Sequence, residues 1–479
     1  GLLTITPEGF TLYCMHVAPG GLLGEPQKLF QTKNLTTSLS FSSNSEFITI
    51  ITADQPGTLH HSLLAFEVSS GKQLARLSDA QASIEDGKFS PLPGDMRLFA
   101  NSDRSGAKRP VIWNASTGER EDLAFDELVG EVLAVDWSPD ASHLLLCQYA
   151  QARQQLYLYD VARKRLTRLQ HPHGSFHGEY FSPDGQIYVH LENATTPMQL
   201  LLLDGATGAQ KQVVFANDAC PPSHPWTSIT FPSSDGQKVQ AWLSVPEGPG
   251  PFPTILDMHG GPSAVMTESF YPRGQCWLDL GFAFLSLNYR GSTTFGKAFE
   301  EQIRGHIGDW ELEDMVAARQ WLVDQKIAHP RQVLLTGWSY GGYLTLLGLG
   351  RRPDLWAGGM AGVAFGDFVI AYEDEAEMLK AYDRGLMGGT PQEKPEAFHK
   401  SSAMTYLEQV RAPLLIIQGR NDTRCPPRSI EVYEQRAKAL GKDIEVVWFD
   451  TGHGSHDTAE RISQQERLLR FAWQIVTTN

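Results

Sequence analysis

The sequence predicts a chain of two domains, an N-terminal β-propeller and a C-terminal α/β domain with a mostly parallel sheet and helices on both faces. Two observations carry this prediction. A turn pattern repeats through the first half, and buried strands alternate with helical segments in the second. The length of 479 residues suits two domains better than one, because single hydrophobic cores rarely grow beyond about 250–300 residues.

The first half repeats an aromatic residue followed by a turn. The four copies are Phe41-Ser42-Ser43-Asn44, Phe89-Ser90-Pro91, Trp137-Ser138-Pro139-Asp140 and Phe181-Ser182-Pro183-Asp184, at intervals of 48, 48 and 44 residues. Each copy has a second turn after an alternating apolar stretch, starting at Glu67, Asn114, Asp160 and Asp204. Repeats of about 40–50 residues with several short strands are typical of propeller blades. The alternative is a β-sandwich with similar hairpins.

The repeats give about four full blades, and residues 2–30 resemble the end of one more. Closed propellers of this kind usually hold more blades. The count therefore indicates either a chain truncated at its start or an unusually small, open propeller, and the sequence leaves both possibilities open.

The repeat stops between residues 216 and 225, in a stretch that carries Pro221, Pro222 and Pro225. Proline clusters mark loops rather than regular elements. We therefore predict a β-propeller domain over residues 1–218 and an α/β domain over residues 219–479.

The second half alternates buried strands with helices. Continuous apolar runs occur at 254–258, 282–287, 333–335, 414–417 and 444–449, and helical patterns such as 309–325, with Asp309 as its N-cap, lie between them. Strands that are apolar throughout are typical of a parallel sheet covered on both faces. This is the layout of the α/β-hydrolase fold.

Residues 335–343 read L-T-G-W-S-Y-G-G-Y, which places Ser339 among glycines directly after an apolar strand. A nucleophilic serine on a sharp strand-to-helix turn needs such small neighbours, because the backbone reverses there without room for side chains. The alternative is a glycine-rich turn with an idle serine.

An activated serine needs a base, and the base needs a carboxylate that orients it. In hydrolases of this type the chain order is serine, acid, histidine. Asp422 follows the strand at 414–417, and His453 lies between two glycines after the strand at 444–449. We predict these two as acid and base, with His456 as the competing base. A metal site made from His453 and His456 is disfavoured, because no carboxylate or thiolate set accompanies them.

Acyl transfer also needs hydrogen-bond donors aimed at the developing oxyanion. His259-Gly260-Gly261-Pro262 follows the strand at 254–258, where hydrolases place this loop. The expected donors are the backbone N–H groups of Gly260 and Tyr340. His259 is expected to be a structural hydrogen-bonding residue rather than a base.

Several motifs occur in a familiar order: H-G-G-P at 259–262, N-Y-R-G-S-T at 288–293, F-G-K-A-F at 295–299, G-W-S-Y-G-G-Y at 337–343, Q-G-R-N-D-T-R at 418–424 and G-H-G at 452–454. In these the chain resembles the prolyl oligopeptidase family of serine peptidases, most closely its acylaminoacyl-peptidase branch. The resemblance covers nearly the whole chain, because members pair an N-terminal propeller with a C-terminal hydrolase.

The resemblance implies Ser339, Asp422 and His453 as the catalytic triad, and Gly260 and Tyr340 as oxyanion donors. It also implies that Arg424 binds a main-chain carbonyl of the substrate, although a local salt bridge is the alternative for this arginine. Members usually carry a small aliphatic residue where this chain has Cys425.

For other residues near these motifs, a structural role is weighed against contact with the substrate. Arg290 is expected in a structural loop, with substrate contact as the alternative. Four aromatic residues could line an apolar pocket, although core packing is the more ordinary role of each: Trp338, Tyr343, Phe365 and Phe368.

Composition excludes some classes of function. The formal net charge of −15 argues against a nucleic-acid partner, which would need a basic surface. The five cysteines are scattered and form no C-x-x-C pair, so neither a disulfide framework nor a structural zinc site is expected. The absence of a long apolar run or a leader-like start predicts no membrane partner and a cytoplasmic location. We expect no cofactor and no metal, and a homo-oligomer remains possible.

The predicted function is a serine peptidase that hydrolyses short peptides through an acyl-enzyme, with the propeller excluding folded proteins. The alternatives are a dipeptidyl-peptidase-type exopeptidase, an esterase or thioesterase with the same triad, and a propeller interaction module carrying an inert hydrolase. The propeller region shows no adjacent glutamates that would hold a free amino terminus, since Glu119 and Glu121 resemble a solvated blade edge. This favours blocked or internal peptides.

Overall fold

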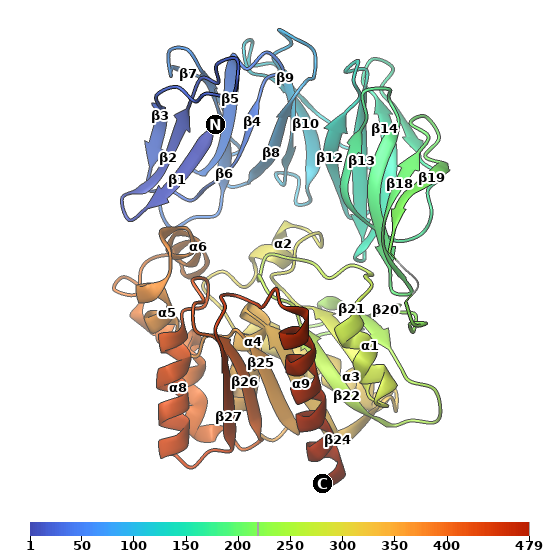
Figure 1. Cartoon of the computed structure of the whole chain (residues 1–479), viewed down its shortest axis with the longest axis vertical. Coiled ribbons are helices and arrows are strands. Elements are labelled where there is room, and N and C mark those ends of the chain that lie inside the picture. The colour runs from blue at the N-terminus through green and yellow to red at the C-terminus, as the bar shows by residue number, and fades with distance from the viewer. Residues whose placement is uncertain (218–219, 479) are drawn as a thin grey trace.

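The N-terminal half of the chain folds into five antiparallel sheets set side by side in an arc (Figure 1). The computed structural model describes residues 1–217 and 220–478. The first sheet has three strands: β1 (Leu2–Thr6), β2 (Gly9–Cys14) and β3 (Gln27–Thr32). Four sheets of four strands follow: β4 (Thr36–Phe41), β5 (Phe47–Ala53), β6 (His61–Glu67) and β7 (Gln73–Leu77); β8 (Ile84–Phe89), β9 (Arg97–Ser102), β10 (Arg109–Asn114) and β11 (Arg120–Asp122); β12 (Glu131–Trp137), β13 (His143–Ala150), β14 (Arg153–Asp160) and β15 (Arg165–Arg168); β16 (Ser175–Phe181), β17 (Ile187–Asn193), β18 (Thr196–Leu203) and β19 (Gln210–Ala216). This is the predicted propeller architecture.

Hydrogen bonds explain why the turn pattern repeats. In the turn between the first two strands of a blade, the serine hydroxyl donates to the acid or amide two residues later. Ser138 Oγ donates to Asp140 Oδ1 at 2.7 Å, and Ser42 Oγ donates to Asn44 Oδ1 at 2.8 Å. The aromatic before it packs between blades, and Trp137 Nε1 donates to the Lys88 carbonyl of the preceding sheet at 3.0 Å. The repeat thus encodes both the turn and the contact with the neighbouring blade.

The C-terminal half forms one eight-stranded sheet in the order β20-β21-β23-β22-β24-β25-β26-β27. Its strands are β20 (Thr227–Pro232), β21 (Lys238–Ser244), β22 (Phe252–Met258), β23 (Ala283–Asn288), β24 (Ala328–Trp338), β25 (Gly358–Gly362), β26 (Leu414–Gly419) and β27 (Ile444–Phe449). The first two strands pair antiparallel and the other six are parallel to one another. The predicted domain boundary at residues 218–219 lies outside the described residues.

Helices cover both faces of this sheet, as predicted. They are α1 (Pro272–Asp279), α2 (Lys297–Glu301), α3 (Trp310–Asp324), α4 (Tyr340–Arg351), α5 (Phe368–Asp374), α6 (Glu377–Met387), α7 (Pro395–Ser401), the 3-10 helix η1 (Ala403–Gln409), α8 (Pro427–Ala439) and α9 (Thr458–Thr478). Successive strand residues point to opposite faces, so Leu335 packs in the cluster with α3, α4 and α8, and Leu334 in the cluster with α1 and α9.

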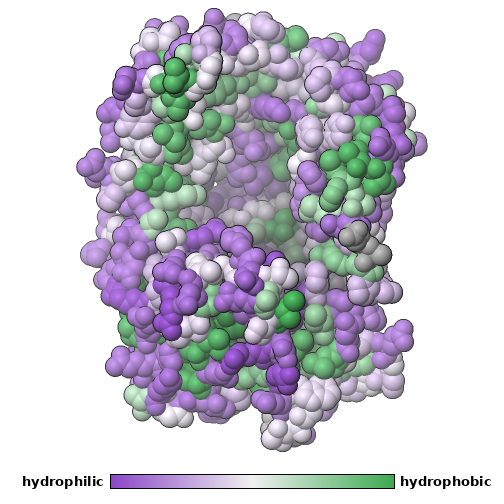
Figure 2. Space-filling model, in the orientation of Figure 1, coloured by the Kyte–Doolittle hydropathy of each residue, from purple (hydrophilic) through white to green (hydrophobic). Residues whose placement is uncertain are grey.

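The carboxyl ends of the parallel strands face the propeller. In Figure 1, α9 starts near the junction of the two domains, directly after the loop that follows β27, and descends to the C-terminus on the far side. Figure 2 shows a hollow between the arms of the propeller and the α/β domain. In the described part of the chain, no helix is both long and apolar enough to cross a membrane.

Two expectations about charged residues are settled by the structure. Asp309 precedes α3 but makes no capping hydrogen bond; its carboxylate instead pairs with Arg351 and Lys400, at 2.8 and 2.6 Å, which corrects its expected role. Arg290 is fully buried and binds Asp314 at 2.6 Å and Asp235 at 2.7 Å. Its side chain is therefore structural and out of reach of a substrate.

We expect Arg290→Ala to destabilise the α/β domain by about 3–5 kcal/mol, because removal of one partner leaves the buried Asp314 carboxylate uncompensated. Urea unfolding measures the loss. Arg331→Ala is the control, because this exposed side chain has no ion pair among the described residues. A change below about 1 kcal/mol in Arg290→Ala would contradict the structural role.

Candidate active site

Ser339 occupies a strained turn between β24 and α4. Its backbone has φ of 60° and ψ of −121°, a conformation that non-glycine residues rarely adopt. The glycines around it permit close backbone contacts: a Cβ on Gly337 would lie 2.4 Å from the Gly341 backbone, and one on Gly341 would lie 1.9 Å from the Met258 carbonyl oxygen. The turn thus has the geometry of a nucleophile elbow.

Asp422 lies in the loop after β26, and its side chain is held in one position. Its Oδ1 accepts hydrogen bonds from the backbone N–H groups of Arg424 at 2.8 Å and Cys425 at 2.9 Å. The residue is only 3 % exposed. These bonds fix the carboxylate so that it faces the next loop along the sheet edge.

His453 lies in that next loop, after β27, and its Nδ1 contacts Asp422 Oδ2 at 2.8 Å and Oδ1 at 3.0 Å. Asn421 ties the two loops together, donating from its backbone to the Thr451 carbonyl at 3.1 Å and from Nδ2 to the Asp450 carbonyl at 2.7 Å. The structure therefore brings the predicted acid and base into direct contact, and leaves the histidine Nε2 for another partner.

Cys425 lies close both to the serine and to the pair formed by Asp422 and His453. Its Sγ is 3.9 Å from Ser339 Oγ. Ligand atoms of Asp422, Cys425 and His453 all lie within 4.8 Å of one another. No hydrogen bond between Ser339 and His453 is recorded among the described residues, and such bonds are often long before substrate binds. Nothing in the sequence indicated this central position, because Cys425 belongs to no motif of its own.

Burial raises the pKa of the Cys425 thiol well above its ordinary range, and the Asp422 charge adds to the effect. The thiol therefore stays protonated at neutral pH and is a poor nucleophile beside the serine hydroxyl. These same three side chains form the one cluster with metal-ligand spacing in residues 1–217 and 220–478.

The loop after β22 packs against the elbow, as the oxyanion prediction requires. A Cβ on Gly260 would lie 3.3 Å from Ser339 Cβ and 3.9 Å from its Oγ. Tyr340 is the first residue of α4, so its N–H has no acceptor inside the helix. The backbones of the two predicted donors thus both lie beside the serine.

Buried polar side chains support this loop from below. His259 contacts Ser292 Oγ through Nε2 at 2.8 Å and the Gly260 carbonyl through Nδ1 at 2.7 Å, and its ring stacks on Tyr289. Burial lowers the pKa of His259 to about 4, so the ring is neutral at physiological pH. The prediction of a structural histidine is confirmed.

Glu311 supports the elbow through Tyr340, whose hydroxyl donates to Glu311 Oε1 at 2.6 Å. Burial raises the pKa of Glu311 to about 7. Nothing in the sequence distinguished this glutamate from the solvated acids at the start of α3.

Arg424 lies in the loop beside Asp422, and its side chain is exposed. In the described residues its guanidinium has neither an ion pair nor a hydrogen bond, so the salt bridge that was its alternative is not formed.

Of the four predicted pocket aromatics, Tyr343, Phe365 and Phe368 are buried and pack on one another, with ring centroids 4.7–5.0 Å apart. Core packing describes these three better than a pocket does.

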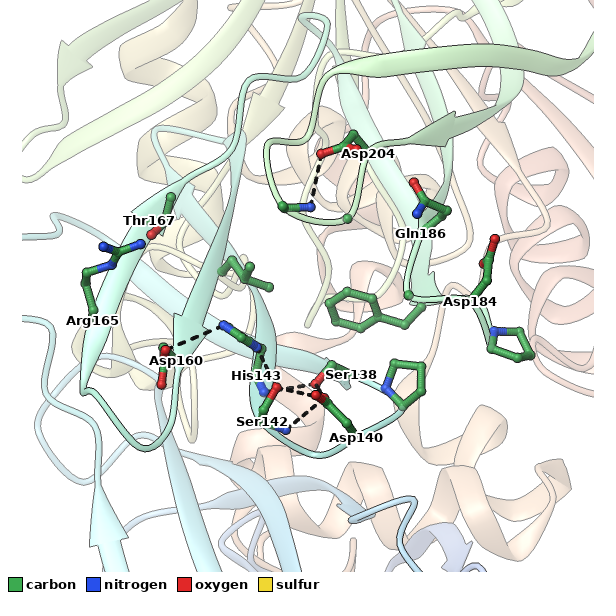
Figure 3. A pocket seen from close by; sticks show the side chains of 17 residues that line it. Ser138, Asp140, Ser142, His143, Asp160, Arg165, Thr167, Asp184, Gln186 and Asp204 are labelled. Carbon is green, nitrogen blue, oxygen red and sulfur yellow. Dashed lines mark hydrogen bonds and ion pairs between the residues drawn. The ribbon is translucent and has the colours of Figure 1, made fainter.

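A large cavity lies elsewhere, between the turns of the last two propeller blades (Figure 3). It has a volume of about 590 Å³, and Asp140, Asp160, Asp184 and Asp204 line it. Each of these carboxylates already accepts hydrogen bonds within its own turn, and these bonds lower its pKa. The acids are therefore turn residues, and their hydrogen bonds within the turns account for their presence in the cavity wall.

Residues 268–478 match the model of the prolyl oligopeptidase family. Dipeptidyl aminopeptidase BIII of Pseudoxanthomonas mexicana is 26 % identical over 414 residues, which cover 85 % of this chain and 55 % of the relative. Acylamino-acid-releasing enzyme 2 of Oryza sativa subsp. japonica is 28 % identical over 234 residues, 46 % of this chain and 30 % of the relative.

The chain thus spans about half the length, or less, of these curated relatives. Among solved structures, a puromycin hydrolase superposes with a TM-score of 0.84 at 19 % identity, covering 94 % of this chain and 71 % of that one. This likeness confirms the fold, a propeller joined to an α/β-hydrolase domain.

We expect Gly341→Ala to prevent correct formation of the elbow, because the new methyl group would lie 1.9 Å from a backbone carbonyl. The free energy of unfolding should fall by about 3 kcal/mol or more, or soluble protein should be lost. Gly24→Ala is the control, because its Cβ would make only ordinary contacts, the nearest at 3.4 Å. Normal stability of Gly341→Ala would contradict the tight packing of the elbow.

Proposed function

We propose that this protein is a serine peptidase that hydrolyses short peptides through an acyl-enzyme, in the manner of an acylaminoacyl peptidase or oligopeptidase. The observation that carries the proposal is the contact between His453 Nδ1 and Asp422, 2.8 Å long, at the edge of the sheet where the strained Ser339 turn also lies. Ser339, Asp422 and His453 are the proposed triad, and the backbone N–H groups of Gly260 and Tyr340 the proposed oxyanion donors.

The chemistry follows from this arrangement. His453 Nδ1–H donates to Asp422, so Nε2 is the atom that accepts the Ser339 proton while Oγ attacks the peptide carbonyl. The two backbone N–H groups stabilise the resulting oxyanion. The histidine then protonates the leaving amine, and water attacks the acyl-enzyme by the reverse sequence of proton transfers. Asp422 keeps the ring oriented and stabilises its positive charge.

Two features favour peptides over simple esters. Arg424 is exposed beside the triad, and its guanidinium has no partner among residues 1–217 and 220–478. A planar donor there can hold a main-chain carbonyl of the substrate in register. The carboxyl edge of the sheet faces the propeller, which would admit short peptides and exclude folded proteins (Figure 1). An esterase or thioesterase would need neither feature. A dipeptidyl peptidase remains the second candidate, because one relative is named a dipeptidyl aminopeptidase.

A fluorophosphonate probe should label Ser339, and Ser339→Ala should abolish labelling while the protein stays folded. In-gel fluorescence after probe treatment measures this, and circular dichroism checks the fold. Ser105→Ala, an exposed propeller serine, should label normally. Undiminished labelling of Ser339→Ala would refute the nucleophile.

Arg424→Ala should lower kcat/KM for an acetylated peptide anilide by about 10–100-fold, since a hydrogen bond to a charged group contributes roughly 1.5–3 kcal/mol. The loss on p-nitrophenyl acetate should be smaller, because this ester has no second carbonyl to hold. Arg420→Ala is the matched control, because that arginine stacks on Trp448 and lies 3.5 Å from Asp450. Equal losses on both substrates would show that Arg424 has no part in peptide recognition.

A further inference from the structure

Two carboxyl groups, Glu375 and Asp383, lie side by side close to the active site. Glu375 directly follows α5, and Asp383 lies on α6. The two side chains are within hydrogen-bonding reach of each other. Asp383 is only 8 % exposed, and among the described residues neither its Oδ2 nor Glu375 Oε2, both buried, has a donor. Buried acceptors without donors are rare, so these oxygens need either a proton shared between the two carboxyl groups or a donor from a ligand.

The pair borders the two loops that flank Ser339. On one side, Glu375 is close enough to Cys425 for its charge to act on the thiol, and Cys425 Sγ is 3.9 Å from Ser339 Oγ. On the other side, Tyr382, the residue before Asp383, contacts Ser263 Oγ at 2.9 Å, directly after the Gly260 to Pro262 loop. A ligand group that binds these carboxyl groups would therefore lie close to the scissile bond.

The basic side chains nearest to the pair interact with other groups. Lys380 donates to the Glu373 carbonyl at 2.9 Å and lies over the Tyr372 ring. Arg384 donates to Glu377 Oε1 at 2.6 Å and to the Tyr372 hydroxyl. In the described part of the chain neither forms an ion pair with Glu375 or Asp383, so the pair has no counter-ion of its own.

Burial raises the pKa of both carboxyl groups, and the neighbouring Asp383 charge raises that of Glu375 further. Two carboxylates so close together cannot both be ionised without a cation, so the empty pair retains a proton near neutral pH. An ammonium or guanidinium group would replace that proton and satisfy both orphaned oxygens.

We infer that Glu375 and Asp383 form a specificity site that binds a positively charged group of the substrate, either a free α-ammonium or a Lys or Arg side chain near the cleaved bond. This inference rests on the proposed peptidase function and names its substrate class. From the sequence, paired acids were sought only in the propeller region, and these two are eight positions apart and meet only through the turn between α5 and α6.

The test compares matched peptide anilides. One pair is acetylated and carries Arg or its neutral isostere citrulline, at the residue before the cut bond or at the one preceding it. The other pair is neutral in its side chains and has a free or an acetylated amino terminus. At pH 8 we expect kcat/KM to favour the cationic member of at least one pair by about tenfold or more, and the pair that shows it identifies the source of the cation.

Glu375→Gln should reduce that preference by about tenfold. The amide can donate to Asp383 as the shared proton does, so the variant imitates the protonated pair and should fold. Glu373→Gln is the matched control: it removes the same charge two residues away, from an exposed side chain that pairs with Arg428 at 2.6 Å. A merely structural role would lower kcat/KM for both members of a pair alike and leave their ratio unchanged.

The wild-type enzyme supplies a second measurement that needs no variant. The raised pKa values mean that the pair loses its proton as pH rises, so the preference for Arg over citrulline should increase between pH 6 and pH 9. A pH effect on the chemical step that is common to both substrates cancels in the ratio.

Hydrolysis of the neutral peptides without any preference for a cation, at every pH, would overturn this inference and leave the proposed function intact. No hydrolysis of any peptide, together with no labelling of Ser339, would overturn the proposed function itself.

Discussion

The close approach of the elbow to the loop after β22 is the constraint on which the rest of the site depends. Gly341 lies against the Met258 carbonyl, and Gly260 lies against Ser339, so neither position tolerates a bulkier residue without movement. This contact holds the serine hydroxyl and the Gly260 backbone on one side of the same small space. The Asp422 and His453 loops reach the same edge of the sheet because parallel strands all end there.

The propeller and the α/β domain are joined by apolar as well as polar contacts, because Leu35 and Leu59 of the propeller belong to the same hydrophobic cluster as Leu386 of α6. Lys297 lies 3.3 Å from Asp103, His60 lies 3.1 Å from Glu301, and His173 lies 2.8 Å from Glu268. Such polar contacts contribute little net stability when partly solvated, so they fix the register of the domains while the shared apolar cluster supplies the adhesion.

Much of this molecule follows from its sequence. The aromatic-and-turn repeat, the apolar strands and the order of Ser339, Asp422 and His453 all reflect local chemistry that a single chain displays: turn hydrogen bonds, burial on both faces and the need for small residues at a sharp turn. β25 escaped prediction because its sequence, GGMAG, lacks the branched residues of a buried strand. Its glycines instead make room for α4, since a Cβ on Gly359 would lie 2.6 Å from Leu349.

What the sequence could not show depends on distant residues meeting in space. The Glu375 and Asp383 pair and the contact of Cys425 with Ser339 involve no sequence motif. The Asp309 carboxylate pairs with Arg351 and Lys400 instead of capping α3, the role that its position before the helix predicts.

The most direct test of the account is to trap the covalent intermediate. The protein would be quenched in acid during turnover of a slow acyl ester, digested, and examined by mass spectrometry for the peptide that carries the acyl group. The account predicts the acyl mass on Ser339. Acyl transfer to Cys425, or turnover that leaves no acylated peptide, would contradict it.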